Sequence, residues 1–306
     1  MRRRGLSRWA IAAVLTGVAL VLLVPLPQGS RATSAILNLL HAPLFAILAY
    51  AAAHHWHSRR GGPIGHVAVV AGLALAVAGG VLEALQRLVE RSPGWNDALA
   101  NILGAATGSL VFVAVRSRRW TAAALIAAAL LLLGVASWGP VITLADHLRQ
   151  MRDPALLGSF EDELELSRWS AHDAAMRRSR EHATHGDWSL RIELTTATYP
   201  GVGSRDLPRD WSQYEELVFD VTLYEGPELN LVTKVYDEPH NLETEDRFNG
   251  RTRISPGRQR VRIPLADIQA APRGREMDLT RVVSLQFFTV RPPEPRTLWF
   301  DHVHLE

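Results

Sequence analysis

The chain has 306 residues, 47% of them hydrophobic, and a formal net charge of +2. It has no cysteine, which excludes disulfides, thiol catalysis and cysteine-based metal sites. Residues 1–150 carry 13 basic and 4 acidic side chains, a net of +9, whereas residues 151–306 carry 20 and 27, a net of −7. The basic side chains of the first half lie in short clusters between apolar runs, which is typical of loops beside membrane helices and not of a nucleic-acid surface.

The first half, residues 1–140, contains five apolar runs, and we predict membrane spans over residues 9–24, 35–56, 64–85, 98–115 and 120–138. A basic start is also typical of a signal peptide, but the spans that follow favour a first membrane helix. Arginines cluster before the first run, after the second and after the fourth, so the positive-inside rule places these loops in the cytoplasm. Five spans then put the rest of the chain outside the membrane, and four would put it in the cytoplasm.

The second half has a different hydrophobic period. After a predicted linker over residues 141–156, the period changes from 3.6 to 2, which indicates strands. Six alternating segments are separated by Pro, Gly, Asp and Asn: residues 189–194, 216–223, 229–236, 258–265, 282–290 and 297–305. We therefore predict an α-helical membrane bundle followed by an all-β domain, a sandwich or jelly roll over residues 157–306.

Polar residues gather in one stretch of the apolar half, residues 81–108, which holds three of its four acidic side chains. Ionisable groups in a membrane are costly, so they indicate function by default. One interpretation is an outer-face pocket for a lipid-linked or head-group substrate, with an acid as base, an arginine for phosphate and a histidine as proton shuttle. The other is a hydrogen-bonded network that fixes helix packing. The residues of this predicted polar pocket are His41, Glu83, Gln86, Arg91, Asp97 and Asn101.

Residues 10–115 resemble the VanZ-like family of membrane proteins. The resemblance rests on a histidine, then E-x-x-Q, an arginine and D-x-x-x-N-x-x-G-x-x-x-G, which here run from His41 through Glu83 and Arg91 to Gly108. Leu39 stands where the family usually has a lysine near the histidine. The resemblance implies a bacterial cytoplasmic-membrane protein of the cell envelope, in a family named after glycopeptide resistance. Gly104 and Gly108 have the spacing of helix-packing glycines.

Residues 157–306 resemble galactose-binding-like jelly rolls of the kind used as carbohydrate-binding modules. The segments that carry this are 160–163, expected to be an opening strand, 184–194, 210–221 and 297–305. The resemblance implies a structural calcium ion held by Glu161 and Asp301, with Asp187 or nearby carbonyl groups completing the oxygen shell. Trp169, Trp188 and Trp211 are candidates for stacking on sugar rings, although most tryptophans of this half are expected in the core.

These patterns favour an integral membrane protein whose extracytoplasmic module binds carbohydrate or another envelope component. One alternative is a membrane enzyme acting on a lipid-linked glycan precursor or a lipid head group. Another is a structural adaptor whose sandwich binds a partner protein. The sequence shows no nucleophile elbow, P-loop or H-E-x-x-H, so no catalytic residue is assigned. The expected partners are membrane lipid and an envelope glycan, and no nucleic acid.

Overall fold

The computed structural model describes residues 31–87 and 95–306, without the side chains of Glu83, Leu85, Gln86, Arg87 and Trp95. The predicted span over residues 9–24 lies outside the described residues. The chain forms two compact units that divide between Leu144 and Ala145. We call them the helical unit and the β unit and describe each by itself.

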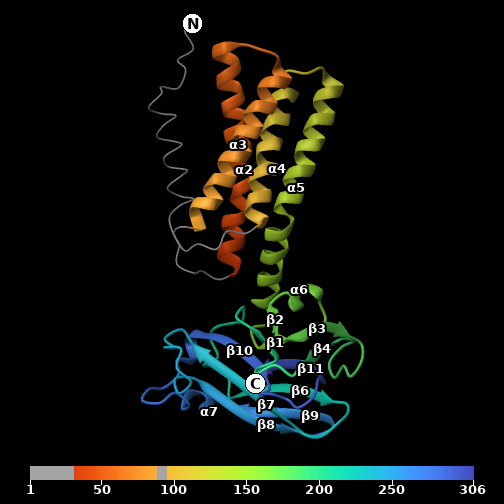
Figure 1. Ribbon diagram of the computed structural model, residues 1–306, viewed down its shortest axis with the longest axis vertical. Coiled ribbons are helices and arrows are strands. Elements are labelled where there is room, and N and C mark those ends of the chain that lie inside the picture. The colour runs from red at the N-terminus through yellow and green to blue at the C-terminus, as the bar shows by residue number, and fades with distance from the viewer. Residues whose placement is uncertain (1–30, 88–94) are drawn as a thin grey trace. The chain divides into compact units, whose positions relative to one another are not determined.

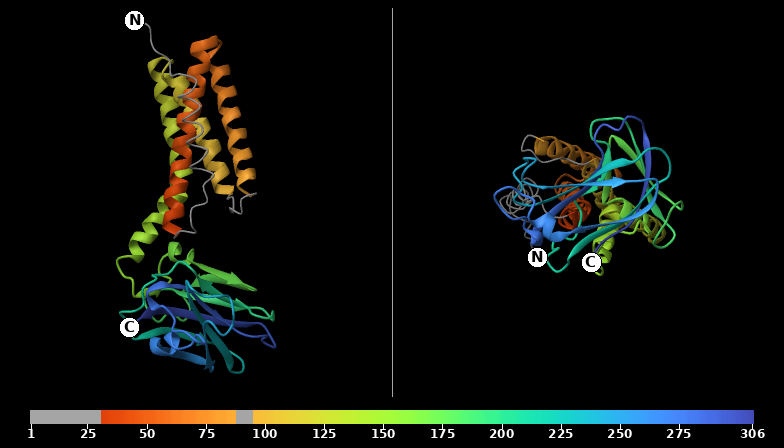
Figure 2. Two further views of the ribbon diagram at one scale, coloured as in Figure 1. Left: turned by 90° about the vertical axis from the view of Figure 1, so that its left-hand side faces the viewer. Right: turned by 90° about the horizontal axis from the view of Figure 1, so that it is seen from below.

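Four long helices of the helical unit lie side by side (Figure 1; Figure 2). Each is long and apolar enough to cross a membrane, and the predicted spans from residue 35 onward coincide with them. Apolar side chains on their outer surfaces are largely exposed, for example Ile47 at 66% and Leu131 at 69%. Such surfaces suit contact with lipid. The helices are α2 (Arg31–Arg60), α3 (Ile64–Arg87), α4 (Trp95–Ala114) and α5 (Arg119–Gln150).

Helix α4 packs very closely against α2 at its two spaced glycines. A Cβ atom added to Gly104 would lie 2.3 Å from the carbonyl oxygen of Ala42, and one added to Gly108 would lie 2.0 Å from that of Ala46. No other residue leaves room for this approach, which is the packing role that the G-x-x-x-G spacing predicts.

The β unit consists of two antiparallel sheets that face each other (Figure 1). The six-stranded sheet has the order β3 (Ala174–Ser179), β4 (Ser189–Leu194), β11 (Arg296–Leu305), β6 (Glu216–Leu223) and β9 (Gly257–Pro264), with β1 (Leu156–Gly158) paired to β11. The five-stranded sheet has the order β2 (Trp169–His172), β5 (Gly201–Ser204), β10 (Val282–Phe288), β7 (Leu229–Asp237) and β8 (Phe248–Ile254). Three short helices complete it: α6 (Glu163–Leu166), α7 (Leu265–Gln269) and η1 (Leu279–Arg281).

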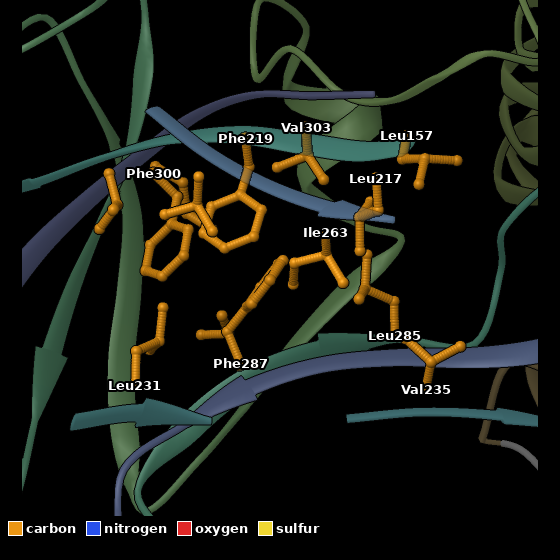
Figure 3. Packing of buried hydrophobic residues seen from close by; sticks show 14 of the residues in the cluster. Leu157, Leu217, Phe219, Leu231, Val235, Ile263, Leu285, Phe287, Phe300 and Val303 are labelled. Atoms are coloured by element: carbon orange, nitrogen blue, oxygen red, sulfur yellow. The ribbon is translucent and has the colours of Figure 1, made fainter. Parts of the chain in front are cut away.

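An aromatic cluster fills the space between the two sheets. Figure 3 shows Phe219 and Phe300 of one sheet packed against Phe287 of the other. The ring centroid of Phe287 lies 4.7 Å from that of Phe219 and 4.9 Å from that of Phe300. Burying one such side chain contributes about 1.5–3 kcal/mol. This core fixes which face of each strand points outward.

The start of the predicted linker is helical, because α5 continues without a break to Gln150. Its last turns are anchored in the β unit. The guanidinium of Arg168 donates from Nε and Nη2 to both carboxylate oxygens of Asp146, at 2.9 and 2.7 Å, and both side chains are buried. Gln150 Nε2 donates to the backbone carbonyl of Asp206 at 2.8 Å. Residues 145–150 therefore belong to the β unit.

We expect Arg168→Met to destabilise a fragment of residues 145–306 by about 3–5 kcal/mol, because it leaves the buried Asp146 carboxylate without its bidentate partner. Urea unfolding followed by tryptophan fluorescence measures this. Arg149→Ala is the matched control, since Arg149 pairs with Asp162 where both side chains are about half exposed. That change should cost less than about 1 kcal/mol. Equal losses for the two variants would contradict the anchoring role of the buried pair.

Candidate functional site

Two of the predicted membrane-pocket residues meet directly. His41 Nδ1 of α2 and Asn101 Oδ1 of α4 are 3.0 Å apart, and both side chains are buried. Because an amide oxygen only accepts, the ring nitrogen donates. One turn nearer the starts of the same helices, Asn38 and Asp97 line a cavity. Helices α2 and α4 thus carry two pairs of polar residues, one helical turn apart.

The cavity lies among α2, α4 and α5 and has a volume of about 300 Å³. Its polar lining comes from α2 and α4, and within the described residues the side chains of Ser34, Asn38, Asn96 and Asp97 make no hydrogen bond to protein. Helix α5 supplies a wall of small and apolar residues. The remaining lining residues are Arg31, Ala35, Leu99, Ala100, Val135, Ala136, Gly139, Pro140 and Thr143.

Pro140 leaves one backbone carbonyl of this wall without a helical hydrogen bond. Proline has no N–H, so it gives no helical hydrogen bond to the carbonyl of Ala136 one turn before it. Thr143 Oγ1 donates to the carbonyl of Gly139 at 3.0 Å. The cavity therefore combines hydrogen-bond donors, a carboxylate and a carbonyl acceptor.

The structure describes three of the six predicted pocket residues fully: His41, Asn101 and Asp97. The side chains of Glu83 and Gln86, and all of Arg91, lie outside the described residues. The sequence reasoning left out the lining residues Arg31, Ser34 and Asn38. Ser34 and Asn38 lie seven and three residues before His41, on one stripe of α2, and that spacing was the available signal.

A second polar surface lies on the outer face of the five-stranded sheet. Along β10, Leu285 and Phe287 point into the core, so Gln286 and Phe288 point outward. The register aligns outward positions of all five strands in two rows. One row is Ser170, Gly203, Gln286, Lys234 and Asn249, and the next is His172, Gly201, Phe288, Val232 and Arg251.

Two glycines of β5 make room for the side chains beside them. A Cβ atom on Gly203 would lie 2.5 Å from Cγ of Gln286, and one on Gly201 would lie 2.5 Å from Cβ of Phe288. Tyr199, which is 54% exposed, packs edge-on against Phe288 with ring centroids 5.9 Å apart. The face thus carries exposed aromatic surface beside an amide side chain.

The next outward position of β7 adds another aromatic ring. Lys234 Nζ lies 5.2 Å from the ring centroid of Tyr236, whose ring lies 4.7 Å from that of His240. Burial, together with the positive charges of Arg247 and Arg205, lowers the pKa of Lys234. The outer face therefore offers aromatic, amide and cationic groups within two or three neighbouring rows.

The predicted sugar-stacking tryptophans lie elsewhere. Trp169 and Trp211 are core residues, 4% and 0% exposed, and present no ring to a ligand. Trp188 is partly exposed, but the guanidinium of Arg178 lies over its ring at 4.2 Å from the centroid. Stacking on Trp188 stays a prediction.

The predicted opening strand at residues 160–163 is a turn that leads into α6. Phe160 has a left-handed φ of 60°, and the carboxylate of Asp162 caps α6 by accepting from the N–H of Leu164 at 2.9 Å. Glu161 between them faces the loop of residues 184–188. Its Oε1 accepts from the N–H groups of Asp187 at 3.0 Å and Trp188 at 2.8 Å.

The third predicted calcium ligand, Asp301, also binds backbone N–H groups. Its Oδ2 accepts from Thr184 at 2.6 Å and His185 at 2.9 Å, and its Oδ1 accepts from His302 at 2.7 Å. Burial raises the pKa of Asp301 against the opposing effect of these donors. In the described part of the chain, no group of three His, Cys, Asp or Glu residues is placed to hold a metal ion. In this arrangement Oε1 of Glu161 and both carboxylate oxygens of Asp301 accept from N–H groups and hold the loop directly.

Three histidine rings stack beside Asp301. The ring of His302 lies 4.4 Å from that of His185 and 3.9 Å from that of His304, between centroids. Burial, and then the neighbouring His304 and His185, lower the pKa of His302 to about 4. His302 therefore stays neutral in the folded protein at physiological pH.

No family model and no curated protein matches this chain. Among solved structures, it is similar to the family 11 carbohydrate-binding module from Clostridium thermocellum in complex with a β-1,3-1,4-mixed-linked tetrasaccharide. The two are 14% identical over 49% of this chain and 94% of that chain, with a TM-score of 0.40. A family 30 carbohydrate-binding module of a Clostridium thermocellum cellulosomal cellulase is 21% identical over 50% of this chain and 93% of that chain, with a TM-score of 0.36. An exo-β-agarase is 14% identical over 50% of this chain and 25% of that chain, with a TM-score of 0.40.

The β-sandwich architecture of the C-terminal half rests on its own two antiparallel sheets. The resemblance of residues 10–115 to the VanZ-like family stays a prediction.

We expect the melting temperature of the 145–306 fragment to be the same with calcium and with excess chelator, because backbone N–H groups already occupy the carboxylates of Glu161 and Asp301. Differential scanning calorimetry measures it. Asp301→Ala should lower the melting temperature in both conditions, since it releases the loop of residues 184–188. A melting temperature that falls only on chelation would support the predicted calcium site instead.

We expect His302 to make the fragment less stable in acid. Its pKa is about 4 when folded and 6.5 in the reference state, so the unfolded chain takes up the proton first as pH falls. The stability is complete above pH 6.5 and is lost progressively toward pH 4. Urea midpoints measured across this range for the wild type and for His302→Asn, which tolerates the left-handed φ, should converge in acid. Parallel pH curves for the two proteins would refute this.

Proposed function

We propose that the β unit binds carbohydrate through the outer face of its five-stranded sheet. The observation that carries the proposal is the pair of aligned rows of amide, hydroxyl and cationic side chains, with the partly exposed rings of Phe288, Tyr199 and Tyr236 within or beside them. Aromatic rings suit the apolar C–H faces of sugar rings. Convergent donors and acceptors beside them suit sugar hydroxyl groups.

The row through Gln286 supplies hydrogen-bonding groups, and the row through Phe288 supplies aromatic surface. Phe288 and Tyr199 form one aromatic surface, and Tyr236 a second. Gln286, Lys234 and Asn249 follow one another on three adjacent strands, so their polar ends face the same side of the sheet. A chain of sugar residues lying across the strands would meet rings and polar groups in turn.

We propose that the helical unit anchors this module in the bacterial cytoplasmic membrane as a VanZ-like domain of the cell envelope. Arg59 and Arg60 end α2, and Arg116, Arg118 and Arg119 precede or begin α5. The positive-inside rule favours the cytoplasm for both clusters, so α5 would end on the outer side. Its 32 residues extend about 48 Å at 1.5 Å per residue, longer than the roughly 30 Å of bilayer hydrocarbon. The β unit that follows α5 would then be extracytoplasmic.

We expect Phe288→Ala to weaken glycan binding by roughly tenfold, because it removes the central ring of the face. The full chain in detergent micelles is screened on a glycan array, and the affinity for the strongest ligand is measured by interferometry. Thr297→Ala, at an outward position of the six-stranded sheet, is the control and should bind like the wild type. A wild type that binds no glycan, or equal losses in both variants, would contradict the proposal and favour the adaptor alternative.

The cavity of the helical unit supports a second candidate function, the binding or processing of a lipid head group or lipid-linked precursor. The observation that favours it is the set of polar side chains, Asp97 among them, that line the cavity without hydrogen-bond partners among the described residues. Side-chain donors and acceptors that line a cavity without protein partners are available to a polar occupant.

We expect Asp97→Asn to reduce the phosphatidylethanolamine that stays bound to the purified full chain, because the cavity loses the carboxylate that would pair with the head-group ammonium. Native mass spectrometry counts the bound lipids. Ser109→Ala on the same helix is the control, since its hydroxyl donates to the carbonyls of Ala68 and Ala105 and not into the cavity. Unchanged lipid binding by the folded Asp97→Asn protein would contradict this candidate, and loss of folded protein would favour the packing interpretation.

A further inference from the structure

We infer that the glycan held by the five-stranded sheet is an anionic polysaccharide, recognised by four cations of this face, three on or next to β7 and β8 and one at the end of β5. The four are Lys234, Arg205, Arg247 and Arg251, and we call them the cationic cluster. This inference rests on the proposed function, because it specifies the charge of the ligand for the same surface. The carbohydrate-binding rows supply rings and amides, and the cationic cluster adds groups that neutral sugars do not require.

The strand register places Lys234 and Arg251 on neighbouring strands of the outer face. Lys234 points outward from β7 and pairs in register with Asn249 of β8. Arg251 is the next outward position of β8 after Asn249, because outward positions alternate along a strand, and Arg247 directly precedes β8. Arg247 Nε donates to the side-chain oxygen of Asn249 at 3.2 Å. Arg205 directly follows the end of β5.

Within residues 31–87 and 95–306, none of the four cations forms an ion pair. Other arginines of the β unit do: Arg275 is held by Asp237 at 2.6 Å and by Asp246 at 2.5 Å, and Arg260 by Asp220 at 2.8 Å. The second half of the chain has 27 acidic and only 20 basic side chains, so acidic partners are abundant. Four neighbouring cations without an acidic partner therefore form a positively charged area on a unit that is acidic as a whole.

Three of the four charges also act on one another. The pKa of Lys234 is lowered by burial and then by Arg247 and Arg205, which places three positive charges within electrostatic reach. Burial lowers the pKa of His172 on the far edge strand, and the charge of Lys234 lowers it further. This mutual repulsion opposes folding, and a bound anion would offset it.

The composition of the face favours an acidic glycan over a nucleic acid. A net charge of −7 on the second half repels a polyanion with one charge per phosphate. A polysaccharide with sparser carboxylate or phosphate groups presents fewer charges to the acidic remainder of the unit. It also uses the aromatic and amide rows, which lie directly beside the cations.

The test compares matched glycans on the full chain in detergent micelles. The probes are half methyl-esterified polygalacturonate and its fully methyl-esterified form, and sparsely phosphorylated dextran and plain dextran, with a single-stranded oligonucleotide as a competing polyanion. We expect one or both anionic glycans to bind at least about tenfold more tightly than their neutral counterparts, with affinity falling as salt rises from about 0.05 to about 0.5 M. Which of the two binds distinguishes carboxylate from phosphate recognition.

The double variant Lys234→Gln and Arg251→Gln should lose roughly three- to tenfold of the affinity for the anionic glycan and most of its salt dependence. Arg177→Gln, an exposed arginine on β3 of the other sheet, is the matched control and should change neither. Equal affinity for charged and neutral glycans would overturn the inference while leaving the proposed function intact. Tighter binding of the oligonucleotide than of any glycan would overturn it, and absence of all glycan binding would overturn both.

Discussion

The packing of aromatic side chains between the two sheets is the constraint on which the functional surface depends. Phe287 of β10 is locked between Phe219 and Phe300, so its neighbours on the same strand have to point outward. A slip of one residue would exchange the two faces of the strand and place Gln286 in the core. The same alternation on β7 turns Lys234 and Tyr236 outward. The composition of the binding face is therefore a consequence of the core register.

The helical unit obeys a comparable constraint through its smallest residues. Gly104 and Gly108 let α4 approach the backbone of α2, and this approach brings His41 and Asn101 within hydrogen-bonding distance. The polar residues one turn nearer the starts of these helices line the cavity. One contact between α2 and α4 thus determines both the helix packing and the position of the polar residues. The hydrogen-bonded network and the pocket, which the sequence offered as alternatives, lie one helical turn apart.

Much of the architecture follows from the sequence, but the binding face does not. The six alternating segments all became strands, because their side chains repeat with period two. The other strands were missed for physical reasons: β5 has only Gly201, Val202, Gly203 and Ser204 to show a pattern, and β8 alternates mostly among polar residues. Adjacent Phe287 and Phe288 are equally apolar, so the sequence alone does not tell which one faces the core. Tryptophan was the obvious sugar-stacking residue, yet Trp169 and Trp211 were needed to fill the core.

Lys234 allows the central claim to be tested directly, because it is the only lysine in the chain. An amine-specific acylating reagent would label it and the N-terminus alone, and mass spectrometry would measure the rate at each site. If glycan lies across the five-stranded sheet, saturating anionic glycan should slow the labelling of Lys234 several-fold and leave the N-terminus unchanged. Labelling of Lys234 at the same rate with and without bound glycan would contradict the account, because it would place the ligand on another surface.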